Sequence, residues 1–120
     1  MLSSLVTLLK VLGDSSRLRI LKLLQQKELC VSEISAILGL ANSTVSRHLW
    51  LLRMAGIIRA SREGKWVSFR LNSSISNRSI RAIVSTALEH IESDEAVLRD
   101  RRRAGKVDRV EVRRLQRSKR

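Results

Sequence analysis

The 120-residue sequence contains no proline and no tyrosine, and it has only one cysteine and three aromatic residues. A single cysteine excludes an internal disulfide framework and favours a reducing compartment, the cytoplasm. With so few aromatic side chains, leucine, isoleucine and valine must build the core, which favours a mainly helical protein. No apolar run approaches the roughly 20 residues that a membrane-spanning helix needs. The apolar N-terminus is interrupted by Lys10 and lacks the basic leading segment of a signal peptide.

Negative charge is also scarce, since the 24 Lys and Arg residues face only 11 Asp and Glu residues and the formal net charge is +13. The excess is greatest after residue 98, where eleven Lys and Arg residues accompany three Asp and Glu residues. Such an excess favours a nucleic acid or another anionic surface as the partner. We therefore divide the chain into a folded domain at 1–98 and a basic C-terminal extension at 99–120. In isolation we expect this extension to be frayed or disordered.

Apolar residues recur at helical spacing in five segments, and we expect helices at about residues 2–12, 15–24, 31–38, 42–55 and 80–98. Asp14 suits the cap at the start of the second helix, and Gly39 suits the left-handed residue that ends the third. Between the last two helices the apolar period changes to two, in short runs on either side of Gly64, which predicts a β-hairpin. The fold class is mainly α with a small β-hairpin.

A short helix, a turn with Gly39 and a second helix that starts with polar residues have the layout of a helix-turn-helix. The first turns of such a second helix enter the major groove of DNA, where short polar side chains reach base edges or phosphates. The expected groove contacts are Asn42, Ser43, Thr44, Ser46 and Arg47. The basic hairpin that follows would form a wing along the DNA backbone or minor groove. The expected wing contacts are Arg59, Arg62 and Lys65.

The sequence offers no set of residues for enzymatic catalysis. Ser46 and His48 are two residues apart on one expected helix, so they point to different faces, and no acidic third member is near. Two other functions fit the composition besides a DNA-binding regulator. One is a constitutive architectural or RNA-binding protein without an inducer, and the other is a redox or metalloid sensor that uses Cys30 alone.

Several motifs in order, together covering about residues 2–98, resemble the ArsR/SmtB family of winged-helix repressors. The motifs are LGDSSRLRILKLL at 12–24, ELCVSEIS at 28–35, GLANSTVSRHLWLLRMAGII at 39–58 and REGKWVSFRL at 62–71. The resemblance implies five helices with a two-stranded wing, a homodimer held by the first and last helices, and an inverted-repeat operator in double-stranded DNA. It also implies that repression ends when an inducer binds. A dimer presents two recognition helices to two half-sites about one helical turn apart.

The resemblance also implies where metalloid sensing would occur, and the sequence departs from that pattern. Arsenic sensors of the family commonly carry a box like ELCVCDLC, in which three thiolates suit a soft ion. Here Cys30 keeps the first position, whereas Ser32 and Ser35 replace the other two thiols. Cys30 also stands at a helix start with Glu33 three residues on, as in a capping box. It is either a cap substitute and small apolar group, or a thiol that the helix dipole favours as thiolate.

Zinc sensors of the family often place ligands on the last helix in an Asp-x-His pattern followed by His-x-x-Glu or His-x-x-His. In the nearest register only His90 is retained, with Asp94 about one turn later. The candidate metal ligands are therefore Cys30, His90 and Asp94, which do not form a complete set. The sequence predicts no cofactor and leaves the inducer open between a metal, a metalloid and another signal.

Overall fold

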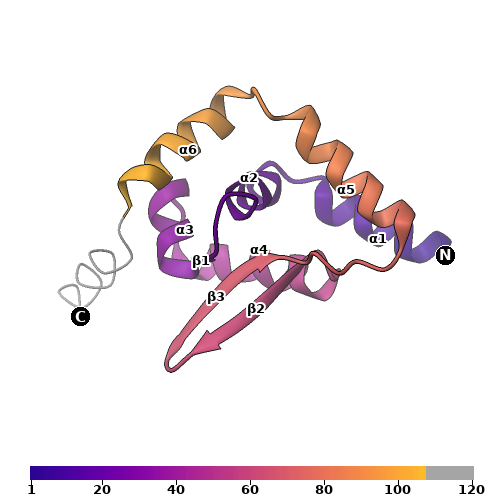
Figure 1. Ribbon diagram of the computed structural model, residues 1–120, viewed down its shortest axis with the longest axis horizontal. Helices are drawn as coiled ribbons and strands as arrows, with labels where there is room; N and C mark the ends of the chain where they lie inside the picture. The colour runs from indigo at the N-terminus through magenta and orange to yellow at the C-terminus, as the bar shows by residue number, and fades with distance from the viewer. Residues whose placement is uncertain (108–120) are drawn as a thin grey trace.

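The computed structural model describes residues 1–107, which form six helices and three strands (Figure 1). In chain order they are α1 (Leu2–Leu12), α2 (Ser15–Leu24), β1 (Leu29–Cys30), α3 (Val31–Leu38), α4 (Asn42–Met54), β2 (Ile58–Glu63), β3 (Trp66–Leu71), α5 (Arg78–His90) and α6 (Glu95–Lys106). This confirms the predicted winged helix-turn-helix, with one helix and one strand more than expected. No helix in this part of the chain is long and apolar enough to cross a membrane.

The signals that end and begin helices act as the sequence predicts. The Asp14 carboxylate accepts a hydrogen bond of 3.0 Å from the backbone N–H of Arg17, which caps α2. Gly39 ends α3 with a φ of 71°, and Gly64 turns the wing with a φ of 60°. Both values lie in the left-handed region, which glycine adopts at little cost. These positions fix the turn of the helix-turn-helix and the tip of the hairpin.

The sheet has the strand order β1-β3-β2, with both pairings antiparallel. The short strand β1, which the periodicity did not predict, pairs Leu29 with Phe69 of β3. Because β1 leads directly into α3, this pairing ties the base of the wing to the helix-turn-helix. The wing is therefore held in a defined position beside α4.

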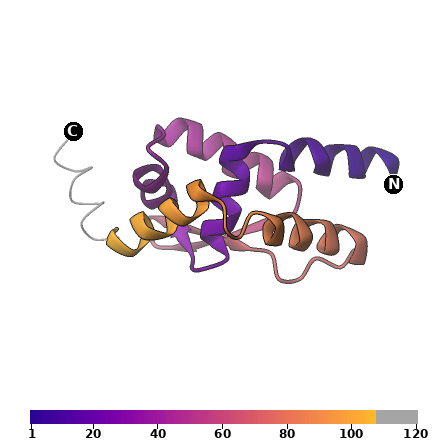
Figure 2. The same ribbon diagram turned by 90° about the horizontal axis from the view of Figure 1, so that it is seen from above.

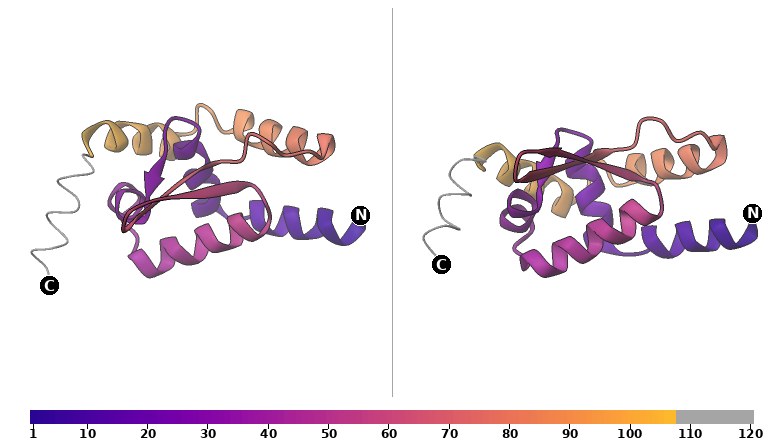
Figure 3. Two further views of the ribbon diagram at one scale, coloured as in Figure 1. Left: turned by 60° about the horizontal axis from the view of Figure 1, so that its bottom comes forward. Right: turned by 90° about the horizontal axis from the view of Figure 1, so that it is seen from below.

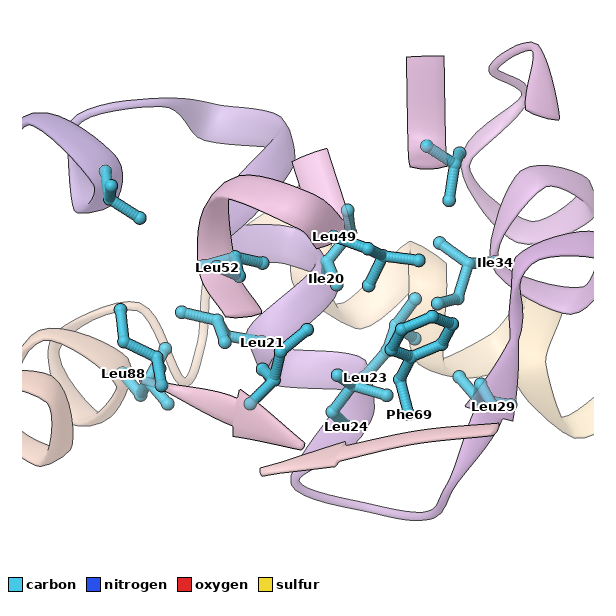
Figure 4. Packing of buried hydrophobic residues seen from close by; sticks show 14 of the residues in the cluster. Ile20, Leu21, Leu23, Leu24, Leu29, Ile34, Leu49, Leu52, Phe69 and Leu88 are labelled. Atoms are coloured by element: carbon cyan, nitrogen blue, oxygen red, sulfur yellow. The ribbon is translucent and has the colours of Figure 1, made fainter. Parts of the chain in front are cut away.

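The core is built around α2, whose Ile20 and Leu21 are completely buried. Figure 4 shows the ring of Phe69, from β3, packed beside Leu23 and Leu29. Helices α1, α4, α5 and α6 pack against α2, α3 packs against α4 and α6, and α4 and α6 lie on opposite sides of α2 (Figures 2 and 3). Aliphatic side chains thus supply nearly the whole core, as the scarcity of aromatic residues predicts.

The expectation of one continuous helix from residue 80 to 98 is wrong. Helix α5 ends at His90 and α6 starts at Glu95, after a cap in which Asp94 accepts a hydrogen bond of 2.8 Å from the N–H of Ala96. The expectation of a frayed extension is wrong for its first residues, because α6 packs against α2 and α3. The division of the chain into two parts after residue 98 stays a prediction, and in the structure this boundary lies inside α6. The rest of the predicted extension, residues 108–120, lies outside the described residues.

The packing of α6 has a cause that hydrophobic periodicity does not show. Asp100, only 1% exposed, accepts two hydrogen bonds of 2.8 Å from the guanidinium group of Arg19 on α2. Val97 is also buried, and Arg103 donates to the carbonyl oxygen of Ile37 at the end of α3 over 3.2 Å. A bidentate ion pair of this kind fixes geometry as well as adding energy. Charged residues therefore act together with the apolar contacts of Val97 and Ala104 to order the first part of the basic extension.

Candidate nucleic-acid interface

Helix α4 presents one face to the core and the opposite face to solvent. Val45, Leu49 and Leu52 are at most 1% exposed and pack inward. The five expected groove contacts all lie on the exposed part of the helix: Asn42, Ser43, Thr44, Ser46 and Arg47. The structure therefore brings these polar side chains together on one accessible surface.

The N-terminus of α4 is open to an anion. Ala41 stands at the cap position and offers no side-chain hydrogen bond, and the first turn contains no acidic residue. The first backbone N–H groups of a helix have no partner within the helix and carry the positive end of its dipole. Phosphate groups are favoured at such an end. This feature adds to the polar side chains that surround it.

The wing continues this surface, because β2 packs beside α4 and both lie on the same side of α2 (Figure 1). Arg59, Arg62 and Lys65 are all exposed. Arg62 Nε donates to the carbonyl oxygen of Gly64 over 3.2 Å and so helps to shape the turn. Lys65 stands within that two-residue turn, at the tip of the hairpin.

Across the two long strands, Arg59 stands directly opposite Arg70. Like charges opposite each other on a sheet are unfavourable. Glu28 lies 3.7 Å from Arg70 and relieves part of this repulsion, whereas Arg59 has no ion pair within residues 1–107. A polyanion placed along the wing would relieve the rest.

Arg17 is a positioning residue that the sequence patterns do not reveal. From α2, its guanidinium group donates to the carbonyl oxygens of Val11 at 2.6 Å and Lys10 at 3.2 Å, at the end of α1. Its Nη1 also lies 3.3 Å from Nδ1 of His48 on α4. Arg17 thus links three helices and fixes α4 relative to α1. No local pattern encodes a contact across 31 positions of the sequence, so periodicity alone does not identify it.

The environment of Cys30 answers the question of its reactivity in the folded chain. Its backbone N–H donates to Glu33 Oε1 over 2.9 Å, which confirms the backbone half of the capping box that the spacing indicates. The residue is 4% exposed, and burial raises the pKa of the thiol. Of the two alternatives for Cys30, the burial favours a cap substitute and small apolar group over a thiolate, because desolvation outweighs the helix dipole. Ser35 donates to the carbonyl oxygen of Leu40 and so stabilises the turn before α4.

The other two candidate ligands are exposed. Asp94 caps α6, and His90 borders an apolar surface between α2 and α5 to which Leu18 and Ile83 contribute. Within residues 1–107, no three His, Cys, Asp or Glu side chains gather at a distance that would hold a metal ion. Cys30, His90 and Asp94 therefore do not form a three-ligand site within the described residues.

Comparison with known proteins places this geometry in a family. The sequence model described as "Bacterial regulatory protein, arsR family" matches residues 14–60, which run from the start of α2 into β2. The arsenical resistance operon repressor of Escherichia coli is 41% identical over 71 residues, a match that covers 58% of this chain and 61% of that repressor. The chain thus spans less than two thirds of that relative.

Two further similarities extend over more of the chain. The HTH-type transcriptional regulator KmtR of Mycobacterium tuberculosis is 31% identical over 106 residues, covering 88% of this chain and 78% of KmtR. A homodimeric winged helix-turn-helix DNA-binding domain from Mycobacterium bovis superposes with a TM-score of 0.63 at 26% identity, covering 78% of this chain and 83% of that domain. The chain therefore belongs to the arsR family of bacterial regulatory proteins.

Proposed function

We propose that the protein is a dimeric, cytoplasmic repressor that binds a specific operator in double-stranded DNA and leaves it when an inducer binds. The observation that carries this proposal is the joint surface of α4 and the wing, where exposed polar and cationic side chains have few acidic neighbours. The only acidic side chain on the two wing strands is Glu63. A surface of this kind suits a polyanion, and nothing in it calls for an enzymatic step.

The proposed contacts divide by chemistry. Asn42, Ser43, Thr44 and Ser46 stand in the first two turns of α4, where amide and hydroxyl groups reach base edges and phosphates. Arg47 is long enough for a bidentate contact to a guanine edge, and it has no ion pair within the described residues. The wing cations Arg59, Arg62 and Lys65 would contact phosphates and add affinity with little sequence preference.

A dimer is supported by an apolar stripe on α1 that no described residue covers. Leu2, Leu5, Val6 and Leu9 are between 38% and 78% exposed, whereas Leu8, Val11 and Leu12 pack into the core. An exposed apolar stripe of this length is unusual on a monomer and marks a contact surface. A second copy is the natural occupant, since a two-fold dimer doubles the reading surface and one of the similar solved domains is homodimeric.

The inducer follows less directly from the structure. An arsenic ion held by three thiolates of the box at α3 is not part of the proposal, because the chain has a single cysteine. A redox or metalloid sensor that uses Cys30 alone is a second function. It requires the region of β1 and α3 to open, since the thiol is buried. Under that function Cys30→Ser abolishes release by the inducer and leaves operator affinity intact; an unchanged response would remove it.

The main proposal is tested by fluorescence anisotropy with a duplex from the region upstream of the chain's own gene and a duplex of shuffled sequence. We expect much tighter binding to the first, and a loss of about tenfold or more in affinity for Arg47→Ala with a relaxed base preference. Arg99→Ala, which replaces another exposed arginine, on α6, is the matched control and should bind as wild type does. Equal affinity of wild type for both duplexes would instead favour a constitutive architectural or RNA-binding protein.

A further inference from the structure

Trp50 on α4 is exposed to an extent that packing within the chain does not explain. Its side chain is 59% exposed, whereas Trp66 is half-buried and Phe69 is only 9% exposed. Tryptophan offers the largest apolar area of any residue, and it is mostly buried in folded proteins or at their contact surfaces. The fold thus leaves its most exposed aromatic ring on the helix that we propose reads DNA.

Trp50 lies on the same line of α4 as the proposed groove contacts. Successive helical residues turn by 100° and rise by 1.5 Å, so Trp50 is about 20° from Ser43 around the axis and about 4.5 Å beyond Arg47 along it. The buried residues Val45 and Leu49 lie on the other side of the helix. The major groove is about 12 Å wide. When it receives the first turns of α4, the sugar-phosphate backbone at the edge of the groove lies beside the third turn of the helix, where Trp50 stands.

The charges around the ring select the partner. Arg47 and Arg53 stand one turn before and one turn after Trp50, and both are exposed without an ion pair within residues 1–107. A second copy of the chain that covered Trp50 would desolvate both guanidinium groups and would need carboxylates to pair with them. Neither α1, with its exposed apolar stripe, nor α4 contains an acidic residue. A DNA backbone supplies the required negative charge on either side of the ring.

We propose that Trp50 is a DNA contact at the wall of the major groove, an assignment that rests on the proposed function. The indole Nε1–H donates to a backbone phosphate, and the ring packs against the adjoining deoxyribose and, where the sequence offers one, a thymine methyl group. Arg47 and Arg53 contact the phosphates that flank this position. The reading surface of α4 then extends over three turns and ends in an apolar contact.

The chain has two tryptophans, so Trp66→Phe leaves Trp50 as the only one and makes its fluorescence a direct probe. We expect the acrylamide quenching constant of this variant to fall roughly threefold or more when the upstream duplex saturates the protein, because the bound backbone shields the ring. Anisotropy of a labelled duplex reports binding independently. If anisotropy shows a complex while the quenching constant stays unchanged, Trp50 is not a contact and the proposed function still stands. If rising protein concentration shields Trp50 without DNA, a second copy covers it and the assignment is wrong.

Affinity variants give a second readout. Trp50→Ala should raise the dissociation constant about tenfold, and Trp50→Phe, which keeps a ring without the N–H donor, about threefold. Both should keep the thermal midpoint of wild type, since Trp50 adds little to the core. Leu98→Ala, on α6 and 38% exposed, is the control and should bind as wild type does. Affinity of Trp50→Ala equal to that of wild type overturns the proposal, whereas failure of wild type to bind the upstream duplex overturns the proposed function and the assignment with it.

Discussion

The cations on the two sides of the molecule differ in how they are paired. On the side of α6, Arg19 makes two hydrogen bonds of 2.8 Å to Asp100, and both Lys22 and Arg101 bind Glu92. On the side of α4 and the wing, Arg47 and Lys65 have no ion pair within the described residues. Within residues 1–107, carboxylates thus pair with cations where helices must be held together, whereas α4 has no acidic residue and Glu63 is the only one on the two wing strands.

This contrast shows that net charge alone does not locate a nucleic-acid interface. A cation that already has a carboxylate in the folded chain must lose that partner, or share it, before it gains from a phosphate. A solvated cation without a partner can bind a phosphate without first losing another contact, and its binding releases counterions from the DNA. Pairing within the fold, taken together with the position of each cation, is therefore a better guide to function than the count of Lys and Arg residues.

The largest effect is expected from breaking the pair that holds α6. Asp100→Ala leaves the guanidinium group of Arg19, whose side chain is 19% exposed, without its partner. The free energy of unfolding should fall by about 3 kcal/mol, as is typical when one member of a buried pair is removed. Urea unfolding followed by circular dichroism measures the change. Glu95→Ala, an exposed acid earlier on the same helix, is the control and should change it by less than about 0.5 kcal/mol.

The same variant tests whether the two sides are independent. Below its unfolding transition, Asp100→Ala should bind the upstream duplex as wild type does, because no proposed contact lies on α6. A large loss of affinity in the folded variant would mean that α6 and the reading surface are coupled, and the comparison between them would no longer separate stability from binding.

The next largest effect is expected from the wing. Replacing Arg62 and Lys65 together by Gln should weaken operator binding by about tenfold at moderate salt. The slope of log K against log salt concentration should become shallower by about 2, roughly one unit for each phosphate that the variant no longer neutralises. Unfolding by urea should stay as in wild type, since both side chains are exposed. An unchanged salt slope would show that the hairpin does not contact the backbone.

Some residues of the structure can be placed from local sequence patterns, whereas others cannot. The start of α4 and the wing tip are local features, so capping residues, glycines and periodicity are enough to place Asn42 and Lys65 on the correct elements. Arg17 and Asp100 act through contacts with residues distant in the sequence, and no local pattern encodes them. Periodicity does not show the turn after His90 because the apolar period continues through it, while Asp94 caps a new helix there.

Cys30 shows the limit of a local argument in a single residue. Its spacing from Glu33 correctly predicts a position at a helix start, but that position alone leaves open whether the helix dipole favours the thiolate. The strands and α3 bury the side chain to 4% exposure, and this burial raises the pKa of the thiol instead. Burial depends on the whole fold, so the sign of the shift does not follow from the helix terminus alone.

A smaller effect is expected from pH. The hydrogen bond from Lys22, which has the larger effect, and the hydrogen bond from Arg101 both lower the pKa of Glu92 in the folded chain. The folded pKa is below the unfolded one, about 4.3 for an ordinary glutamate, so the contribution of Glu92 to stability is fully present above that value. It is lost as the pH falls through the folded pKa. The difference in urea midpoint between wild type and Glu92→Gln should thus be constant near neutral pH and shrink below about pH 4; a difference that grows on acidification contradicts this assignment.

The smallest effect on DNA binding is expected from the outward face of α6, and it separates charge from position. Arg102 and Lys106 on α6 are exposed and, like the wing cations, have no ion pair within residues 1–107. Helix α6 packs against α2 and α3, and these two helices separate it from α4 (Figure 2). If the position of a cation determines whether it contacts DNA, replacing both residues by Gln should change operator affinity less than about twofold. The slope of log K against log salt concentration should stay within about 0.5 of that of wild type. This variant removes the same charge as the wing variant, so their comparison isolates location. Equal losses in the two variants would mean that the duplex also contacts α6, and the interface would then extend to both sides of the domain.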